Sequence, residues 1–242
     1  MNPQDLFKAG KLNEAIGALS EQLRSNPADS KSRTFLFELL CFSGDYERAE
    51  RQLDVLAHAG PQSEMGAMVY RGLLSATKAR QDVYGERNPS TSATDSASAG
   101  DVTRGNLNGR PFRSLVDADP RIGPNLEVFA AGSYVLIPYS LLSSVEISPP
   151  RRLRDLLWVP AVIRTTPAFQ NRELGETLLP ALTPFAARHS DDAVRLGRET
   201  VWGEDEGGEM RPVGQKILLV DGEEMPILDI RTLEFVAARA AS

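Results

Sequence analysis

Apolar residues recur with helical spacing over the first 84 residues of the chain. Positions three or four residues apart lie on one face of an α-helix, so a stripe of such positions predicts an amphipathic helix packed against a neighbour. The clearest stripe consists of Leu12, Ala15, Ile16, Leu19 and Leu23. A short helix is expected before it, because Asn2 can cap a helix and Pro3 suits the first helical position.

The same pattern returns after 34 residues, where "AGKLNEAIGAL" is matched by "SGDYERAERQL". Gly10 aligns with Gly44, at points where a helix must end and turn. Ala15 aligns with Ala49, and both are small enough for two helices to approach closely. An interval of 34 residues is the period of the tetratricopeptide repeat, a pair of antiparallel helices. We therefore expect about five helices over residues 1–84, stacked as a short solenoid.

Helical repeats of this kind bind peptides or helices of a partner on their concave face. Helical spacing gives four candidates for that face: Arg33, Phe35, Phe37 and Tyr70. Simple core packing is the alternative for each of them, because repeat helices need apolar contacts to hold together. A module built in this way favours binding over catalysis.

Residues 85–110 differ in composition from both flanking regions. They are rich in Ser, Thr, Gly and Asn and contain very few large apolar residues. Such a segment cannot bury enough apolar surface to offset the entropy that is lost on ordering it. We expect a flexible linker or an exposed loop here, between a helical domain at residues 1–84 and a second domain at residues 111–242.

In the second domain the apolar runs are short, rich in β-branched residues and separated by turn signals, which is typical of β-strands. The predicted strands are residues 134–138, 144–148, 156–166, 215–220 and 225–230. Asp221-Gly222 predicts a hairpin between the last two, and Pro160 predicts an edge or a bulge in the third. Two helical segments are also expected, at residues 124–131 and 191–198. The fold class is α+β, with a mainly antiparallel sheet.

A dense series of motifs lies between residues 117 and 161. It comprises Asp-Ala-Asp at 117–119, Arg-Ile-Gly-Pro at 121–124 and Leu-Arg-Asp-Leu-Leu-Trp-Val-Pro-Ala at 153–161. This series is similar to the signature of the ImpE family, which residues 191–202 and 214–235 and the repeat helices also resemble. The family-motif residues, for which we expect structural roles, are Asp117, Asp119, Arg121, Gly123, Arg154, Asp155 and Trp158.

The resemblance implies an accessory protein of bacterial type VI secretion. It implies binding to the small sheath subunit TssB through that subunit's N-terminal helix, and a link to ClpV, the AAA+ ATPase that dismantles contracted sheaths. The family usually has further helices between the repeats and the Asp-Ala-Asp motif, whereas this chain has only the Ser/Thr-rich segment there. A shorter solenoid than usual is therefore expected.

Charge and composition exclude several further classes of protein and partner. The formal net charge is −6 over 242 residues, which argues against nucleic acid as a partner. The single cysteine, Cys41, cannot form an internal disulfide. No run approaches the roughly 20 apolar residues of a membrane span, and the N-terminus lacks the pattern of a signal peptide. We expect a cytoplasmic, soluble protein with neither a nucleic-acid nor a membrane partner.

Motifs of catalysis or cofactor binding are missing from the sequence. It contains no phosphate-binding loop, dinucleotide fingerprint or nucleophile elbow, and neither His58 nor His189 has a neighbour at metal-ligand spacing. We therefore expect no catalytic, cofactor or metal residues, and favour a non-enzymatic adaptor. A hydrolase-like enzyme stays open as the alternative, using the Asp117–Arg121 loop with Arg154 and Asp155 as acid, base or metal-binding groups.

Overall fold

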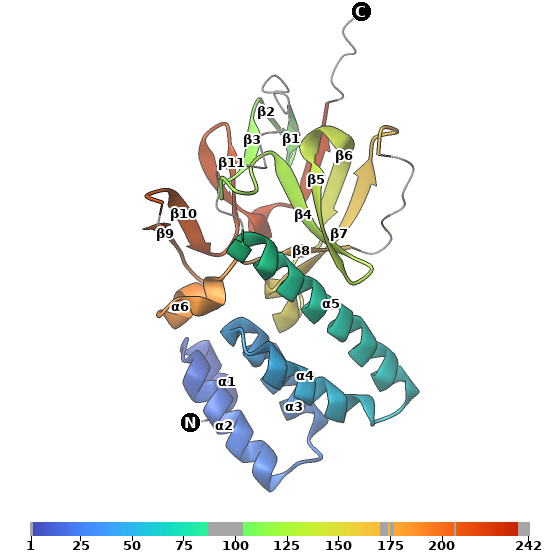
Figure 1. The fold of residues 1–242 in the computed structure, drawn as a ribbon, viewed down its shortest axis with the longest axis vertical. Coiled ribbons are helices and arrows are strands. Elements are labelled where there is room, and N and C mark those ends of the chain that lie inside the picture. The colour runs from blue at the N-terminus through green and yellow to red at the C-terminus, as the bar shows by residue number, and fades with distance from the viewer. Residues whose placement is uncertain (1, 87–103, 170–173, 175–176, 206, 237–242) are drawn as a thin grey trace, which may run out of the picture.

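The computed structural model describes residues 2–86, 104–169, 174, 177–205 and 207–236, with a helical part below the strands in Figure 1. The helices of that part are α1 Pro3–Lys8, α2 Leu12–Ser25, α3 Ser30–Ser43, α4 Tyr46–Ala57 and α5 Pro61–Glu86. The prediction of five helices is confirmed. The Asn2 side chain accepts hydrogen bonds from the backbone N–H groups of Gln4 and Asp5, so it caps α1 as expected.

The repeated glycines and alanines have the roles that their spacing predicts. Gly10 and Gly44 have φ angles of 77° and 75°, a left-handed conformation that glycine adopts without the steric cost of a side chain. Ala15 and Ala49 are completely buried. Each helix from α1 to α5 packs against the next one in the chain. The helical part is therefore a short stack of repeat helices.

Enlarging the small residue at the first helix junction should destabilise the stack. We expect Ala15→Leu to lower the free energy of unfolding by about 1–3 kcal/mol, because extra methylenes in a filled core force neighbours out of place. Urea denaturation measures the change. Ala79→Leu is the matched control, since Ala79 is exposed on α5. Equal midpoints for the two variants would mean that Ala15 is not at a close helix contact.

Antiparallel sheets make up most of the rest of the described chain. The largest has eight strands in the order β2-β1-β13-β6-β7-β8-β4-β5. Its strands are β1 Gly105–Leu107, β2 Arg110–Phe112, β4 Asn125–Ala130, β5 Ser133–Pro138, β6 Leu142–Ile147, β7 Trp158–Thr165, β8 Thr177–Pro180 and β13 Thr232–Phe235. A second sheet has the order β12-β11-β3, formed by β3 Leu115–Asp117, β11 Ile217–Val220 and β12 Glu223–Pro226. The predicted α+β class is confirmed.

The remaining elements are a hairpin and a short helix. The hairpin consists of β9 Thr200–Glu204 and β10 Met210–Gly214, and the helix is α6 Asp192–Arg195. The prediction of a helix over 191–198 is therefore too long, because Gly197 turns the chain with a φ of 64°. The hairpin predicted at Asp221-Gly222 is confirmed by the pairing of β11 with β12.

Two other expectations in this part are wrong. A helix was expected over residues 124–131, but residues 125–130 form strand β4, which pairs with β5 and β8. Leu126 to Ala130 are all buried, and a short run that is apolar on both faces has no periodicity that separates helix from strand. The run predicted over 225–230 leaves the sheet at Pro226 and continues as a 3₁₀ turn.

Pro160 was expected at an edge or a bulge, but β7 lies between β6 and β8. Regular pairing of β7 with β6 starts at Ala161. The Pro160 carbonyl accepts a hydrogen bond from the N–H of Ser148 at 2.9 Å. The proline therefore stands at the end of the β6–β7 ladder, where its missing N–H interrupts the least pairing.

One of the two buried hydrophobic clusters joins the helical part to the large sheet, and the other lies within the sheets. A continuous buried cluster joins helix residues such as Leu39 and Leu74 to Phe129 and Trp158 of the large sheet. In Figure 1, α5 runs from the helical part up to the strands. Of the segment expected to be a linker, residues 87–103 lie outside the described residues, and the chain already pairs within the large sheet from Gly105. No described helix is both long and apolar enough to cross a membrane.

Candidate partner-binding groove and buried ion network

An aromatic row runs from the helical part into the large sheet. The Phe37 ring of α3 lies 5.4 Å from the Tyr70 ring of α5, and the Tyr70 ring lies 6.4 Å from the Trp158 ring of β7. The Arg154 guanidinium stacks over Tyr70, 5.1 Å from the ring centroid, and donates to its hydroxyl. The structure thus brings together two partner-binding candidates from the repeats, Phe37 and Tyr70, and two family-motif residues, Arg154 and Trp158.

The other two repeat candidates lie elsewhere. Arg33 donates to the Gln52 side chain at 2.8 Å and to the Pro27 carbonyl at 2.7 Å. Phe35 packs edge-on against Phe7, with 5.8 Å between the ring centroids. Both residues therefore make contacts within the repeat helices. Phe37 is only 2% exposed, so it packs against Tyr70 within the core and does not reach the surface.

A groove opens where α5 passes the large sheet. Its volume is about 620 Å³, and its apolar lining includes Val69, Leu73, Trp158, Ala161 and Leu178. A smaller hollow of about 270 Å³ lies between α3, α4 and α5. The two share Tyr70 and Arg154 as lining residues. The Tyr70–Arg154 contact therefore forms the partition between two halves of one apolar surface.

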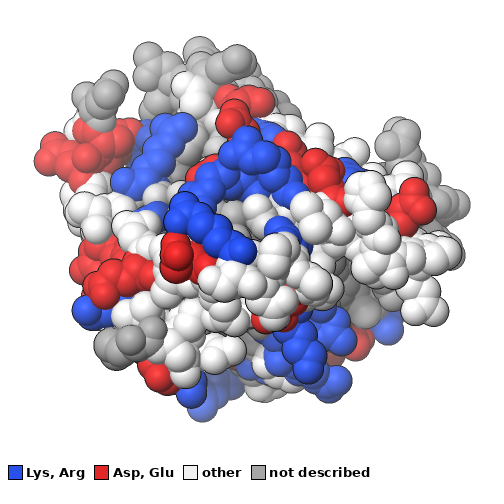
Figure 2. All heavy atoms as spheres, turned by 90° about the horizontal axis from the view of Figure 1, so that it is seen from below, with Lys and Arg blue, Asp and Glu red and all other residues white. Residues whose placement is uncertain are grey.

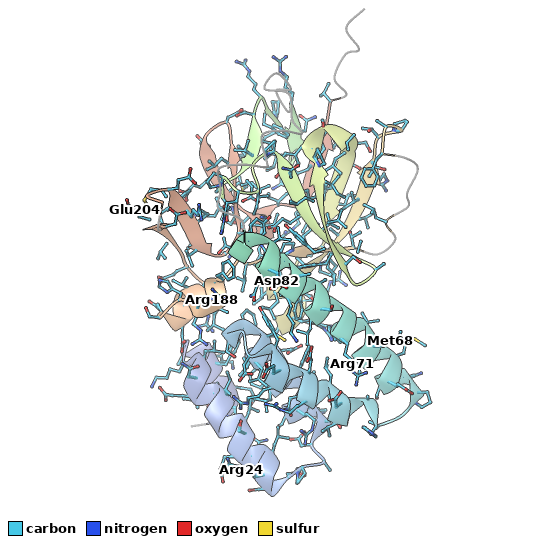
Figure 3. The ribbon with its side chains drawn as sticks, in the orientation of Figure 1. Arg24, Met68, Arg71, Asp82, Arg188 and Glu204 are labelled. Carbon is cyan, nitrogen blue, oxygen red and sulfur yellow. The ribbon has the colours of Figure 1, made fainter. Side chains whose placement is uncertain are left out.

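One face of α5 continues this apolar surface into solvent. Met65, Met68 and Val69 are 72%, 72% and 62% exposed, and their i, i+3, i+4 spacing places them on one side of the helix. Figure 3 shows Met68 pointing away from the molecule. In a third repeat, α5 would be the first helix, but in the described chain it packs mainly on α4 and β5. In a complete third repeat, a second helix would pack against α5.

A 3₁₀ turn from Leu153 to Leu156 holds the polar end of the groove. Its Asp155 carboxylate accepts hydrogen bonds from the backbone N–H groups of Arg151 and Arg152, at 2.8 and 2.9 Å. Asp155 is buried, which fixes the turn from which Arg154 reaches Tyr70. The Trp158 indole N–H donates to the Thr77 hydroxyl of α5 at 3.3 Å. These motif residues therefore shape the groove wall.

Glu127 of β4 is the centre of a buried ion network. Its carboxylate accepts two hydrogen bonds from Arg80 of α5, both at 2.7 Å, and one from Lys216 at 2.5 Å. The Tyr134 hydroxyl donates to it at 2.9 Å. Burial alone would raise the pKa of Glu127, but the charges of Arg80 and Lys216 lower it far below its ordinary value. Lys216 also pairs with Asp117.

The Asp-Ala-Asp motif closes a turn beside this network. Asp119 is fully buried and accepts hydrogen bonds from the Arg121 guanidinium at 2.5 to 3.2 Å. Its own N–H donates to the Asp117 side chain at 2.9 Å. Gly123 has a φ of 58°, and its carbonyl accepts the Asp117 N–H at 2.8 Å. Burial raises the pKa of Asp117 to about 6, against the opposing charge of Lys216.

The enzyme alternative requires this loop to act together with Arg154 and Asp155. Within the part of the chain that the structure describes, no hydrogen bond or ion pair joins the loop to either residue. Asp117 and Asp119 are at most 3% exposed, and each is paired with a cation of the chain itself. The described residues also contain no group of three His, Cys, Asp or Glu side chains placed to hold a metal ion.

Arg80 and Lys216 were not predicted as site residues. Both are buried cations that meet Glu127 from positions 47 and 89 residues away. A signal was present, because Arg80 continues the buried stripe of Leu73, Ala76 and Thr77 at helical spacing, and Lys216 stands at the start of an apolar run. A charge on a buried face indicates a partner of opposite charge.

Glu38 of α3 supplies a prediction about pH. It is 9% exposed, and burial raises its pKa from 4.5 to about 6, while the charge of Arg154 acts in the opposite direction. A raised pKa means that the folded state holds the proton more strongly, so stability decreases as the pH rises from about 4.5 to about 6. We expect Glu38→Gln to remove this slope and to gain about 1 kcal/mol at pH 7. Denaturation at several pH values tests this, with exposed Glu47→Gln as the control.

Charges of both signs are mixed over the helical end of the molecule. Figure 2 views the protein from that side and shows Lys and Arg side chains interspersed with Asp and Glu and with a large uncharged area. Many of these charges pair along or between helices, as Lys78 does with Glu50 at 2.7 Å and Arg71 with Asp54 at 2.8 Å. Such exposed pairs contribute little to stability.

Comparison with known proteins assigns the chain to a family. The family model described as ImpE protein matches residues 109–234. The chain belongs to the ImpE family. A tetratricopeptide repeat model matches residues 6–71, which confirms the interpretation of the 34-residue period.

Relatives of this ImpE protein extend over almost its whole length. The type VI secretion system accessory component TagJ of Pseudomonas aeruginosa is 33% identical over 264 residues, covering 97% of this chain and 91% of TagJ. The crystal structure of protein VPA1032 from Vibrio parahaemolyticus has the same fold, with a TM-score of 0.83, 24% identity and 98% coverage of both chains. The ImpE protein is thus a homologue of a type VI secretion accessory component.

Proposed function

We propose that this ImpE protein is a non-enzymatic adaptor of type VI secretion that acts in the cytoplasm. In this proposal it binds the N-terminal helix of the small sheath subunit TssB and works with the ATPase ClpV. The homology to TagJ supports the secretion system as the setting. The link to ClpV and the choice of TssB rest on the family alone.

The observation that carries the proposal is the exposed apolar face of α5 beside the groove. Met65, Met68 and Val69 form a helical stripe without a covering helix in the described chain. Such stripes accept an amphipathic helix, which anchors through apolar residues at i, i+3, i+4 and i+7. A bound helix would take the place of a second helix of the third repeat, which the described residues do not contain.

The energetics fit a reversible complex. Complete burial of a large aliphatic or methionine side chain stabilises by about 1.5–3 kcal/mol, and three such residues are exposed on α5. The loss of translational and rotational freedom on binding offsets part of this gain. We therefore expect a dissociation constant of the order of micromolar to tens of micromolar. Apolar burial should also give a negative change in heat capacity.

The test is a calorimetric titration with a synthetic peptide of the TssB N-terminal helix, at several temperatures. We expect saturable binding with a negative heat-capacity change. Met68→Asp places a charge on the apolar face and should weaken binding at least tenfold, because the carboxylate must lose water. Met210→Asp is the matched control, since Met210 is 53% exposed on the β9–β10 hairpin, and it should bind as the unmodified protein does. Absence of heat at about 100 μM peptide, with the protein shown to be folded, would contradict the proposal.

A further inference from the structure

A second apolar patch lies on the β3–β11–β12 sheet and the β9–β10 hairpin. In the sheet, Leu219 of β11 pairs with Val116 of β3 on one side and with Glu224 of β12 on the other. Residues that pair across antiparallel strands point to the same face. Val116, Leu219 and Glu224 therefore form a row on one face, where Val116 is 37% exposed.

The hairpin extends this face. Met210 pairs with Glu204, and Trp202, two residues before Glu204 on β9, shares their face. The Trp202 indole N–H donates to the Glu224 side chain at 2.9 Å, which joins the hairpin to the sheet. Trp202 is 38% exposed and Met210 is 53% exposed. Tryptophan is enriched among the residues that dominate the energy of protein interfaces.

The rim of this patch is acidic. Glu204, Glu209, Glu223 and Glu224 are all exposed. Arg211 pairs with Asp205 and Glu209 and is itself only 12% exposed. Arg121 and Arg113 also lie close enough to Asp205 and Asp221 to interact with them electrostatically, so carboxylates outnumber cations here without being alone. The surface that solvent meets therefore combines large apolar side chains with an excess of carboxylates.

We infer that this patch, which we call the hairpin patch, is a docking surface for a protein segment with a large apolar or aromatic residue flanked by Lys or Arg. Its charge complements such a segment, which favours both rate and specificity of association. A second copy of this chain would bring the same carboxylates against each other, and phosphate groups of nucleic acids or lipids would be repelled. A basic protein segment is thus the occupant that the chemistry favours.

The hairpin patch and the α5 groove lie on opposite sides of the molecule. Figure 3 shows Glu204 on the hairpin at one edge and Met68 of α5 at the other. Two partners could therefore be bound at the same time, which is what an adaptor requires. The inference does not depend on TssB, because it concerns a different surface.

Nuclear magnetic resonance offers a direct readout, because the chain has two tryptophans. Trp202 lies in the patch, whereas Trp158, which is 4% exposed, lines the α5 groove and would report binding of a peptide there instead. The probes are two synthetic peptides with the same Trp-Leu centre, one flanked by lysines and the other by glutamates. We expect the lysine peptide to shift the Trp202 indole N–H signal saturably and to leave the Trp158 signal in place. The glutamate peptide should shift neither.

Two variants show which surface of the protein binds the lysine peptide. Glu223→Lys combined with Glu224→Lys should weaken binding of the lysine peptide at least fivefold, while Met68→Asp should leave it unchanged. Unchanged binding of the lysine peptide by the double variant would overturn the inference. So would equal Trp202 shifts with both peptides, or no Trp202 shift with about 2 mM lysine peptide. None of these results would affect the TssB titration, so the two proposals fail separately.

Discussion

Glu127→Gln is expected to lower the free energy of unfolding by about 3–5 kcal/mol. The carboxylate lies at 0% exposure between Arg80 and Lys216. The amide would leave the buried Arg80 without its counter-charge and Lys216 with Asp117 alone. Removing one partner of a buried ion pair costs this much because the remaining charge stays desolvated. Urea or guanidinium denaturation measures the loss. The network joins α5 to the sheet, so both parts should lose stability in one transition.

The matched control for this variant is Glu146→Gln. Glu146 pairs with Arg164, but both side chains are more than half exposed, and such pairs contribute at most about 1 kcal/mol. Equal losses for the two variants would show that the buried network is not a main source of stability. A loss for Glu127→Gln that is several times larger is the expected result.

The stability of the protein in acid should also depend on the Glu127 network. The pKa of Glu127 is lowered in the folded state from 4.5, so its contribution to stability is complete above about pH 4.5 and is lost as the pH falls further. We expect the unmodified protein to lose stability in acid more steeply than Glu127→Gln does, because the amide does not titrate.

Asp119→Ala is expected to have a comparable effect, about 3–5 kcal/mol. Asp119 is fully buried and Arg121 is its partner, at 11% side-chain exposure, so the alanine leaves a largely buried guanidinium unpaired. The turn would also lose the hydrogen bond from the Arg121 N–H at 3.1 Å. Circular dichroism during thermal unfolding measures the loss.

Asp119→Ala also separates the adaptor from the enzyme alternative. Exposed Asp82 of α5, labelled in Figure 3, gives the control Asp82→Ala, which should unfold like the unmodified protein. Loss of stability without a separate functional defect is the result that a structural role predicts. A stably folded Asp119→Ala protein that had lost a turnover activity would instead favour the enzyme.

The helical part of the fold was predictable because its signals are local. The 34-residue period, the glycines at positions 10 and 44 and the buried alanines at 15 and 49 each report on neighbours within one repeat. The exposed face of α5 follows from the same logic, since the third repeat lacks its second helix in the described chain. Predicted strands whose sequences alternate or are rich in β-branched residues are also present in the structure.

The parts that sequence did not predict depend on distant contacts. The sequence predicts a helix where strand β4 lies, because the burial of its two faces comes from distant elements. Phe129 joins the cluster shared with the helices, and Leu126 and Val128 join the cluster within the sheets. The short strands β1, β2 and β13 have three or four residues each and exist through pairing with one another and with β6. Likewise, Arg80, Glu127 and Lys216 form a network only after the helices meet the sheets. No local sequence pattern specifies which residues of the helices and the sheets come into contact.

Hydrogen exchange with and without the TssB helix peptide tests most directly whether the α5 groove is the docking surface. At saturating peptide, the amides of residues 61–73 on α5 and 148–162 around the 3₁₀ turn and β7 are expected to exchange more slowly, because a bound helix would cover them. The β9–β10 hairpin should exchange as in the free protein. Saturable binding that instead protects the hairpin, or that leaves residues 61–73 unprotected, would contradict a docking site on α5.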